Sequence, residues 1–257
     1  MRVLGAAAVM TLLVVQGSAA AQWLKHHDPK IPRTADGKPD LTAPAPRLAD
    51  GRPDLNGLWN AVDGRFLTNL PRRAGVDAPF TPWAAAIFKA RQDNQGRDRP
   101  AGRCLPHTVP TAMLVPGYPW KVLQTPGLTV ILFENFTDFR QIFTDGRDFP
   151  ADRQPAWFGY SIGRWEGDTF VVESTGFNGE AWLDDTGHPR SEEMRVTERI
   201  RRLDVGHLEV EFTFNDPKAY TTPWSVTVPF ELLADTEIIE NYCENERDWA
   251  HVVAAQP

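Results

Sequence analysis

The chain has 257 residues and a formal net charge of −7, from 27 Lys and Arg against 34 Asp and Glu. Nucleic acids and anionic membrane surfaces bind clusters of Lys and Arg, and the sequence contains no such cluster, so neither is expected as a partner. A neutral or cationic small molecule, as ligand or substrate, suits the acidic balance better. The sequence does not predict an oligomeric state.

The first 21 residues follow the order of a secretory signal peptide. Arg2 precedes the apolar run "VLGAAAVMTLLVV", and the small residues of "GSAAAQ" follow it. A membrane anchor is the alternative, but the run is shorter than the roughly 20 apolar residues that span a bilayer. We therefore expect cleavage after Ala21 and a periplasmic or secreted protein without membrane insertion. The remaining 236 residues (257 − 21), with a charge of −8 (26 − 34), suffice for one domain with extensions.

Residues 22–56 are polar and rich in Pro, which predicts an extended arm that wraps the surface or stays mobile. Within it, "DGKPDL" at 36–41 is echoed by "DGRPDL" at 50–55. We interpret the echo as too short to be a structural repeat. His26 and His27 also lie in this arm. Adjacent imidazoles can bind a metal, but exposed residues of a tail are the preferred interpretation.

The segment 57–119 is predicted to be irregular apart from one helix at 81–95. Thr81 can cap this helix, Pro82 fits its first turn, and "WAAAIFKARQDN" supplies strong helix formers. Gly and Pro in "NQGRDRPAG" end it.

Cys104 and Cys243 are the only cysteines. Export places both in an oxidising compartment, where two thiols usually form a disulfide. The bond would close a loop of 138 residues (243 − 104 − 1) and add about 3–5 kcal/mol to stability on the chain-entropy model. Two separate buried thiols are the alternative.

Residues 120–247 consist of short runs rich in Val, Ile, Phe, Thr and Trp, separated by turns such as "EGD" and "DVG". Strands linked this tightly form an antiparallel meander, and closing it into a barrel removes exposed edges. The predicted fold is therefore all-β, a calycin- or lipocalin-like barrel with one N-terminal helix and the Pro-rich arm, followed by a tail at 248–257. We expect strands at 120–125, 128–135, 139–144, 157–165, 168–175, 195–203, 207–214, 224–233 and 237–243.

The stretch "GYSIG" at 159–163 spells G-x-S-x-G, the nucleophile elbow of serine hydrolases. An elbow needs a helix directly after the serine, whereas "RWEGDTFVV" predicts a strand, a turn and a second strand. The chain order Ser161, then Asp184 or Asp185, then His188 does match α/β-hydrolases. A hairpin is the preferred interpretation, and its two glycines mark places where a neighbouring chain approaches or a bulge bends the strand.

The loop at 176–194 holds the densest set of functional groups in the chain. His188 beside Asp184 or Asp185 would have a stabilised imidazolium, which suits general acid–base catalysis. A solvated loop whose carboxylates cap a turn is the alternative. The loop matches no calcium or zinc template, so no metal is expected, and the sequence indicates no cofactor.

Glu198 is an unusual carboxylate. In "MRVTERIRRL" it alternates with three apolar residues and so shares their inward face. A carboxylate placed there must be paired or have a raised pKa, as general acids do. Its expected partner is Arg140 or Arg164, and a purely structural ion pair is the alternative.

Aromatic side chains number 27, from 14 Phe, nine Trp and four Tyr, which is enough to line a cavity as well as fill a core. Tyr220 ends the turn motif "DPKAY" and could orient a substrate. Packing in the core is the alternative for each aromatic residue. The candidate ligand-binding residues are Trp157, Tyr160, Trp182, Trp224 and Arg140.

Several motifs together resemble a family of secreted bacterial proteins of unknown activity. The matching words are "PDLNGLW", "QTPG", "DGRDFPAD", "WFGYSIGRWEGDTFVVESTGFN", "DPKAY" and "YCEN". The likeness covers almost all of the chain after residue 21. It implies an exported protein, and it assigns no catalytic residue.

Three functions are compatible with these features. The first is an exported barrel that holds a small, partly apolar or aromatic molecule in its interior, as a carrier or sensor. The second is a cofactor-independent lyase, isomerase or hydrolase that uses Glu198, His188 and Asp184 or Asp185 for proton transfer, with Tyr220 orienting the substrate. The third is an interaction module that docks through its Pro-rich arm. The first two assume that the strands enclose a hollow cylinder.

Overall fold

The computed structural model describes residues 26–243. The predicted signal peptide at 1–21 and the predicted tail at 248–257 lie outside the described residues. Within the described range, no helix combines the length and the apolar character that crossing a membrane requires.

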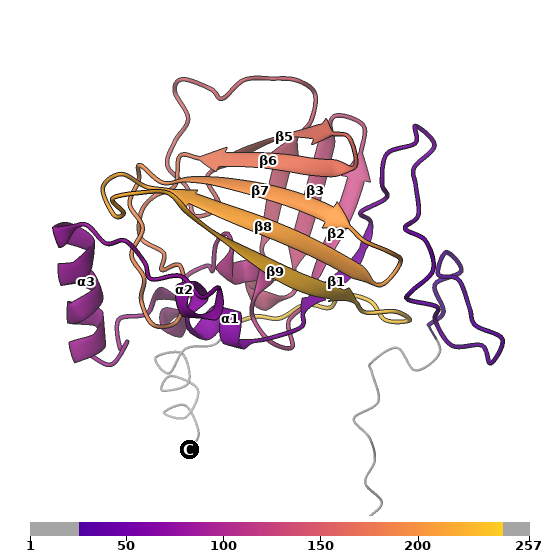
Figure 1. The fold of residues 1–257 in the computed structure, drawn as a ribbon, viewed down its shortest axis with the longest axis horizontal. Helices are drawn as coiled ribbons and strands as arrows, with labels where there is room; N and C mark the ends of the chain where they lie inside the picture. Colours follow the sequence, from indigo (N-terminus) through magenta and orange to yellow (C-terminus); the bar gives the residue numbers. More distant parts are fainter. Residues whose placement is uncertain (1–25, 244–257) are drawn as a thin grey trace, which may run out of the picture.

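Nine strands close into one barrel, in which each strand pairs with its neighbours in chain order and β9 returns to β1 (Figure 1). The prediction of a mostly β, closed barrel is therefore confirmed. The strands are β1 (Gly57–Ala61), β2 (Trp120–Thr125), β3 (Leu128–Phe133), β4 (Phe139–Phe143), β5 (Tyr160–Glu166), β6 (Thr169–Thr175), β7 (Arg195–Arg202), β8 (His207–Asn215) and β9 (Trp224–Leu232).

Two strand predictions were wrong, and they concern the closure of the barrel. β1 lies in the segment that was predicted to be irregular; it has only five residues, too few to show a clear pattern, yet it pairs with both β2 and β9. The predicted strand at 237–243 does not form. Since β8 and β1 occupy both edges of β9, the closed sheet offers no edge to a further strand.

The barrel also departs from a pure meander at one place. β4 and β5 run parallel, with Ile142 opposite Ser161, whereas the other neighbouring strands are antiparallel. A parallel pair cannot be joined by a tight turn. Residues 144–159 therefore form a long loop that arches beyond the strands (Figure 1).

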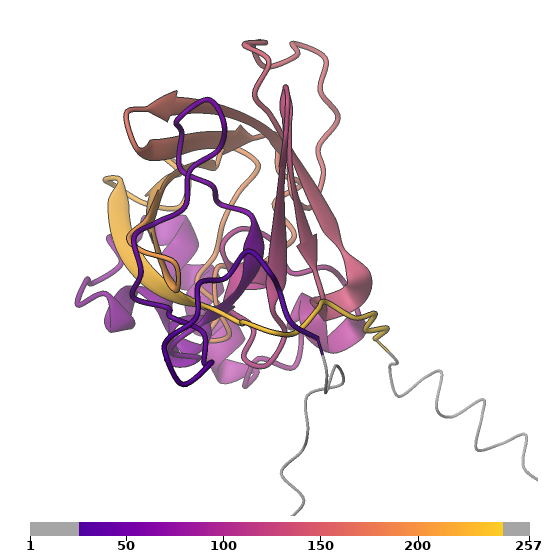
Figure 2. The same ribbon diagram turned by 90° about the vertical axis from the view of Figure 1, so that its right-hand side faces the viewer.

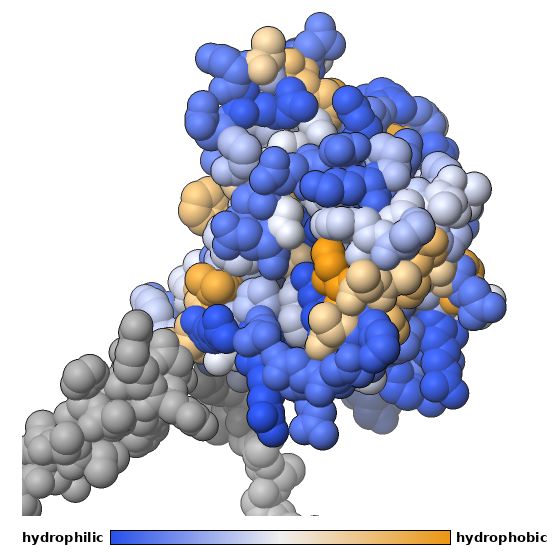
Figure 3. Space-filling model, turned by 90° about the vertical axis from the view of Figure 1, so that its left-hand side faces the viewer, coloured by the Kyte–Doolittle hydropathy of each residue, from blue (hydrophilic) through white to orange (hydrophobic). Residues whose placement is uncertain are grey.

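Three short helices are described between β1 and β2: α1 (Arg65–Thr68), α2 (Leu70–Arg73) and α3 (Pro82–Asp93). α3 begins after Thr81, whose hydroxyl accepts a hydrogen bond from the backbone nitrogen of Ala84 at 3.3 Å. The face that carries α3 is mainly hydrophilic around a small apolar patch (Figure 3). The chain also makes 3-10 turns at Pro100–Arg103, Thr111–Met113 and Asn135–Thr137.

The Pro-rich arm runs along the barrel surface and contains two matching turns (Figure 2). In both copies of the echoed motif, an isolated β-bridge joins the Pro of the motif to an Arg that precedes the copy: Pro39 to Arg33 and Pro53 to Arg47. Each glycine adopts a positive φ, 82° and 86°. Arg33 pairs with Asp235, and Arg47 pairs with both carboxylate oxygens of Asp168. The interpretation of the echo as too short for a structural repeat is thus wrong, because each copy forms the same turn together with the Arg that precedes it.

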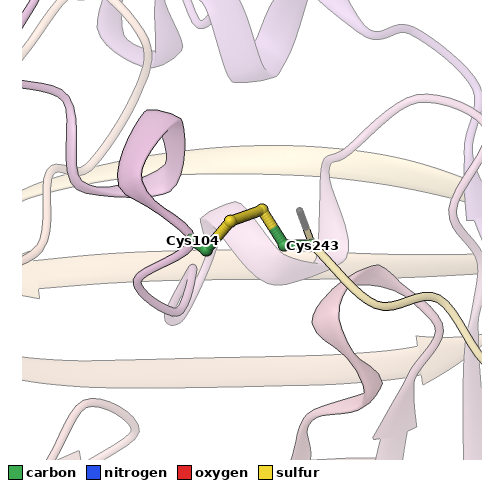
Figure 4. The surroundings of a disulfide bond; sticks show 2 residues. All are labelled: Cys104 and Cys243. Carbon is green, nitrogen blue, oxygen red and sulfur yellow. A yellow bond between two sulfur atoms is a disulfide. The ribbon is translucent and has the colours of Figure 1, made fainter. Parts of the chain in front are cut away.

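Cys104 and Cys243 form the predicted disulfide, with Cα atoms 5.4 Å apart (Figure 4). The bond joins the residue that follows the first 3-10 turn to the segment beyond β9. This segment, 233–243, contains no strand, so the disulfide fixes a stretch that the sheet does not hold.

Candidate functional site

The inside of the barrel is a packed hydrophobic core. Along β8 and β9 every second side chain is buried, as the two-residue period of a strand requires. The cavity between the strands measures about 10 Å³, which is barely enough for one water molecule. The expected hollow space is not present there, because large side chains fill it. The lining residues are Leu55, Trp120, Val122, Thr129, Ile131, Ile142, Phe170, Ile200 and Leu208.

Glu198 lies fully buried inside the barrel and pairs with Arg140, one of the two partners expected from the sequence. Nη1 of Arg140 donates to Oε1 of Glu198 at 3.0 Å, and Nη2 donates to Oε2. Nε and Nη2 also donate to the hydroxyls of Ser161, at 3.1 Å, and Ser174, at 2.7 Å. Both charges are compensated and hydrogen-bonded, so the geometry is that of a structural ion pair.

Ser161 is an inward-facing hydroxyl of β5. Its Oγ lies 2.9 Å from that of Ser174, and a short turn connects β5 to the antiparallel β6 where an elbow would need a helix. A Cβ on Gly163 would lie 2.6 Å from the ring of Phe170, so close packing explains this glycine. The hairpin interpretation is confirmed, and the nucleophile elbow is excluded.

His188 and Asp184 form a buried pair on the loop before β7. Nδ1 of His188 lies 2.7 Å from Oδ2 of Asp184, which also accepts a hydrogen bond from the backbone nitrogen of Leu70 at 2.8 Å. The imidazole packs against Phe80 and Phe88, with ring centroids 5.4 Å and 4.6 Å away. Asp184 therefore ties its loop to the first residue of α2.

Tyr220 lies beside this pair but is bonded elsewhere. Its hydroxyl donates to the carbonyl of Pro189 at 2.7 Å, and its ring stacks on Phe80 at 5.8 Å. Burial raises the pKa of Tyr220 well above its usual value, so the phenol stays protonated at neutral pH. The predicted catalytic residues thus do not form one site: Glu198 lies inside the barrel, whereas the others lie on the loop at 183–190 and on the Tyr220 turn.

Asp185 and Trp182 meet His107 at a small cleft between this loop and the segment around the first 3-10 turn. Its volume of about 20 Å³ has room for a water molecule. Oδ2 of Asp185 lies 2.7 Å from Nη1 of Arg99. Burial, assisted by the charge of Arg99, lowers the pKa of His107 to about 4, and burial raises the pKa of Asp185. Sequence reasoning missed His107, because a lone His in "CLPHTVP" matches no motif.

The His107 imidazole is expected to make the protein less stable in mild acid. In the unfolded chain this group binds a proton near pH 6.5, whereas in the fold it stays neutral down to about pH 4. Between these values the unfolded state binds more protons, so stability falls as the pH falls. Urea denaturation at pH 7 and pH 5 measures the loss in the free energy of unfolding between these pH values, and His107→Gln should make this loss about 1–2 kcal/mol smaller.

His27→Gln, at an exposed position, is the control and should leave the loss as it is in the wild type. An equal loss in the His107→Gln and His27→Gln variants would contradict the prediction.

The remaining aromatic candidates lie at three different places. Trp224 is buried in the core, with its ring 4.5 Å from that of Phe214. Tyr160 stacks on Phe143 at 5.0 Å, and its hydroxyl accepts a hydrogen bond from Arg147 at 3.3 Å. Trp157 is half-buried in the loop before β5. A shared binding role of these residues stays a prediction.

A groove of about 580 Å³ lies on the outer face of β3 and β4. It exists because β3 is apolar on both faces: Val130 and Leu132 point outward, and Ile131 points into the core. The rim carries Phe139, which is 60 % exposed. We call this recess the β3–β4 groove. Its lining is Val130, Leu132, Phe133, Thr137, Asp138, Phe139, Ile238, Ile239 and Glu240.

The second wall of the groove is the segment beyond β9. The backbone nitrogen of Ile239 donates to the carboxylate of Glu134 at 3.2 Å. Asn241 donates its backbone N–H to the hydroxyl of Thr137 at 3.1 Å, and the same hydroxyl lies 3.0 Å from the carbonyl of Asn241. The disulfide at Cys243 fixes the end of this wall. Segments about a hundred residues apart in the chain thus form one recess.

Asp138 is the groove residue whose pKa departs clearly from its usual value. Burial raises its pKa to about 6, and no cation or hydrogen-bond donor of the described residues offsets this shift. At neutral pH the group is therefore an ionised, half-buried carboxylate among apolar side chains.

These features define the class of the protein as a nine-stranded closed barrel with a disulfide-tethered C-terminal segment. Comparisons with family models, curated proteins and solved structures found no match to the chain. A calycin or lipocalin relationship therefore stays a prediction.

Proposed function

We propose that this protein binds a small, partly apolar molecule in the β3–β4 groove, as an exported carrier or sensor. The proposal keeps the ligand class expected from the sequence but places it on the outer face, since the interior cavity measures only about 10 Å³. The single observation that carries it is the groove of about 580 Å³, a volume typical of small-molecule sites.

The chemistry of the groove supports the same ligand class. Small-molecule sites are mostly apolar with a few placed polar groups. Here the aliphatic side chains of β3 and of Ile238 and Ile239 face the recess, while Thr137, Asp138 and Glu240 supply the polar atoms. The disulfide is compatible with an oxidising compartment outside the cytoplasm.

The two alternative functions receive less support from the contacts. An acid–base enzyme would draw on Glu198 and Asp184, whose oxygens are already held by Arg140, His188 and backbone donors. An interaction module would dock through the arm, but Arg33 of the arm is paired with Asp235 beyond β9 and Arg47 with Asp168 in the β5–β6 turn. The groove, in contrast, presents an apolar surface that no described residue covers.

Phe139→Ala is expected to weaken binding of a neutral apolar probe, N-phenyl-1-naphthylamine, about five- to tenfold. The substitution removes aromatic contact area from the rim, and tenfold corresponds to about 1.4 kcal/mol. Fluorescence titration of the full chain measures the effect, and folding should hardly change because the side chain is 60 % exposed.

Leu203→Ala is the matched control, since Leu203 is also exposed, at 51 %, but lies outside the groove. It should leave probe affinity unchanged. Equal affinities for the wild type and Phe139→Ala, or no saturable binding by the wild type, would contradict the proposed function.

A further inference from the structure

Asp138 lines the β3–β4 groove and directly precedes β4. It follows the third 3-10 turn, and its own carbonyl accepts a hydrogen bond from the backbone nitrogen of Phe133 at 2.8 Å, which fixes the main chain. The next residue, Phe139, presents an exposed ring at the same recess. An acidic group and an aromatic surface therefore lie side by side in one apolar recess.

The charged groups around this carboxylate leave the groove negative. Glu240 lines the opposite wall, and Glu134 lies behind it with its carboxylate bonded to the backbone of Ile239. On the wall segment beyond β9, Glu237 is paired with Lys121 of β2. Within residues 26–243, no Lys or Arg lines the groove.

The imidazole of His107 faces the ring of Phe136 at 5.6 Å, on the 3-10 turn before Asp138, and burial keeps it uncharged at neutral pH. Arg140 follows on β4, but its side chain points into the barrel and is bound to Glu198. The His107 imidazole is thus uncharged, and Arg140 and Lys121 are each paired with a glutamate.

We propose that the ligand of the β3–β4 groove is a small organic cation, an ammonium group attached to an apolar body, with Asp138 as its counter-charge. This inference rests on the proposed function and names its ligand class. The ammonium would compensate a carboxylate that has no partner among residues 26–243, and the apolar body would cover Val130, Leu132 and Ile239. Exposed aromatic rings such as Phe139 add a cation–π attraction for quaternary ammonium groups.

The test uses two probes of similar size, benzyltrimethylammonium and benzyl alcohol, titrated calorimetrically into the full chain. The cation carries its charge at every pH, so any pH dependence belongs to the protein. We expect the cation to bind at least about tenfold tighter than the alcohol at pH 7.5. Asp138→Asn should remove this preference and leave the affinity for the alcohol unchanged.

Asp148→Asn is the matched control, because it makes the same charge change at an exposed position of the loop between β4 and β5. It should preserve the preference for the cation. In the wild type, affinity for the cation should fall as the pH drops from 7.5 to 5, with a midpoint near 6 where Asp138 takes up a proton. In Asp138→Asn the profile should be nearly flat, and a profile that stays steep would assign the effect to Glu134 or Glu240 and overturn the role of Asp138.

The outcomes separate this inference from the proposed function. If both probes bind with equal affinity and Phe139→Ala weakens both, the groove binds ligands but the cation class is wrong. If Phe139→Ala weakens neither, the groove is not the binding site and both proposals fail. A preference for the cation that survives Asp138→Asn would overturn the inference alone.

Discussion

Arg140→Met is expected to lower the free energy of unfolding by about 3–5 kcal/mol. The substitution leaves the Glu198 carboxylate fully buried without its counter-charge, and it also removes the donors to Ser161 and Ser174. An uncompensated buried charge costs far more than the pair itself contributes, because neither water nor another cation can reach it. Urea denaturation followed by circular dichroism measures the loss.

Two further variants separate the charge from the packing. Arg140→Met combined with Glu198→Met removes both charges at similar volume and should recover most of the stability. Arg164→Met removes an exposed arginine that pairs with Glu166 and Glu173, and it should cost less than about 1 kcal/mol. Should the double variant be as unstable as Arg140→Met, packing and not charge would be the cause.

Replacing both cysteines by serine is expected to lower the free energy of unfolding by about 4 kcal/mol and to weaken probe binding in the groove. The two residues are 139 positions apart, so the bond removes much conformational entropy from the unfolded chain. It also fixes the end of the wall formed by Ile238 and Ile239. Without it, this segment is held by its hydrogen bonds to Glu134 and Thr137 and by the ion pairs of Asp235 and Glu237.

Thermal denaturation and N-phenyl-1-naphthylamine titration of the double-serine variant measure the two effects. Wild-type protein in dithiothreitol should behave like the variant, which controls for the serine substitutions. Unchanged probe affinity in the reduced protein would show that the disulfide does not position the groove wall.

Most strands were predictable from the sequence, because the alternation of apolar and polar residues that indicates a strand lies within a few neighbouring positions. β8 and β9 alternate buried and exposed side chains along the whole strand, and the turn "EGD" separates β5 from β6. The same alternation predicted that Glu198 points into the barrel. Arg140 was a candidate partner because it lies on a nearby predicted strand. One available signal was overlooked: "LTVILF" is apolar on both faces, which indicates that its outer face is also covered or used.

The sequence was sufficient for the closed barrel, the disulfide and the inward carboxylate, because each follows from periodicity or from residue type over a short window. Only the tertiary structure showed that side chains fill the interior and that β1 closes the barrel between β2 and β9. It also showed that Asp138 and Ile239 line the same groove. These depend on how side chains fill a shared volume and on contacts between residues a hundred positions apart. Neither has a local pattern, so the groove became visible only in the assembled fold.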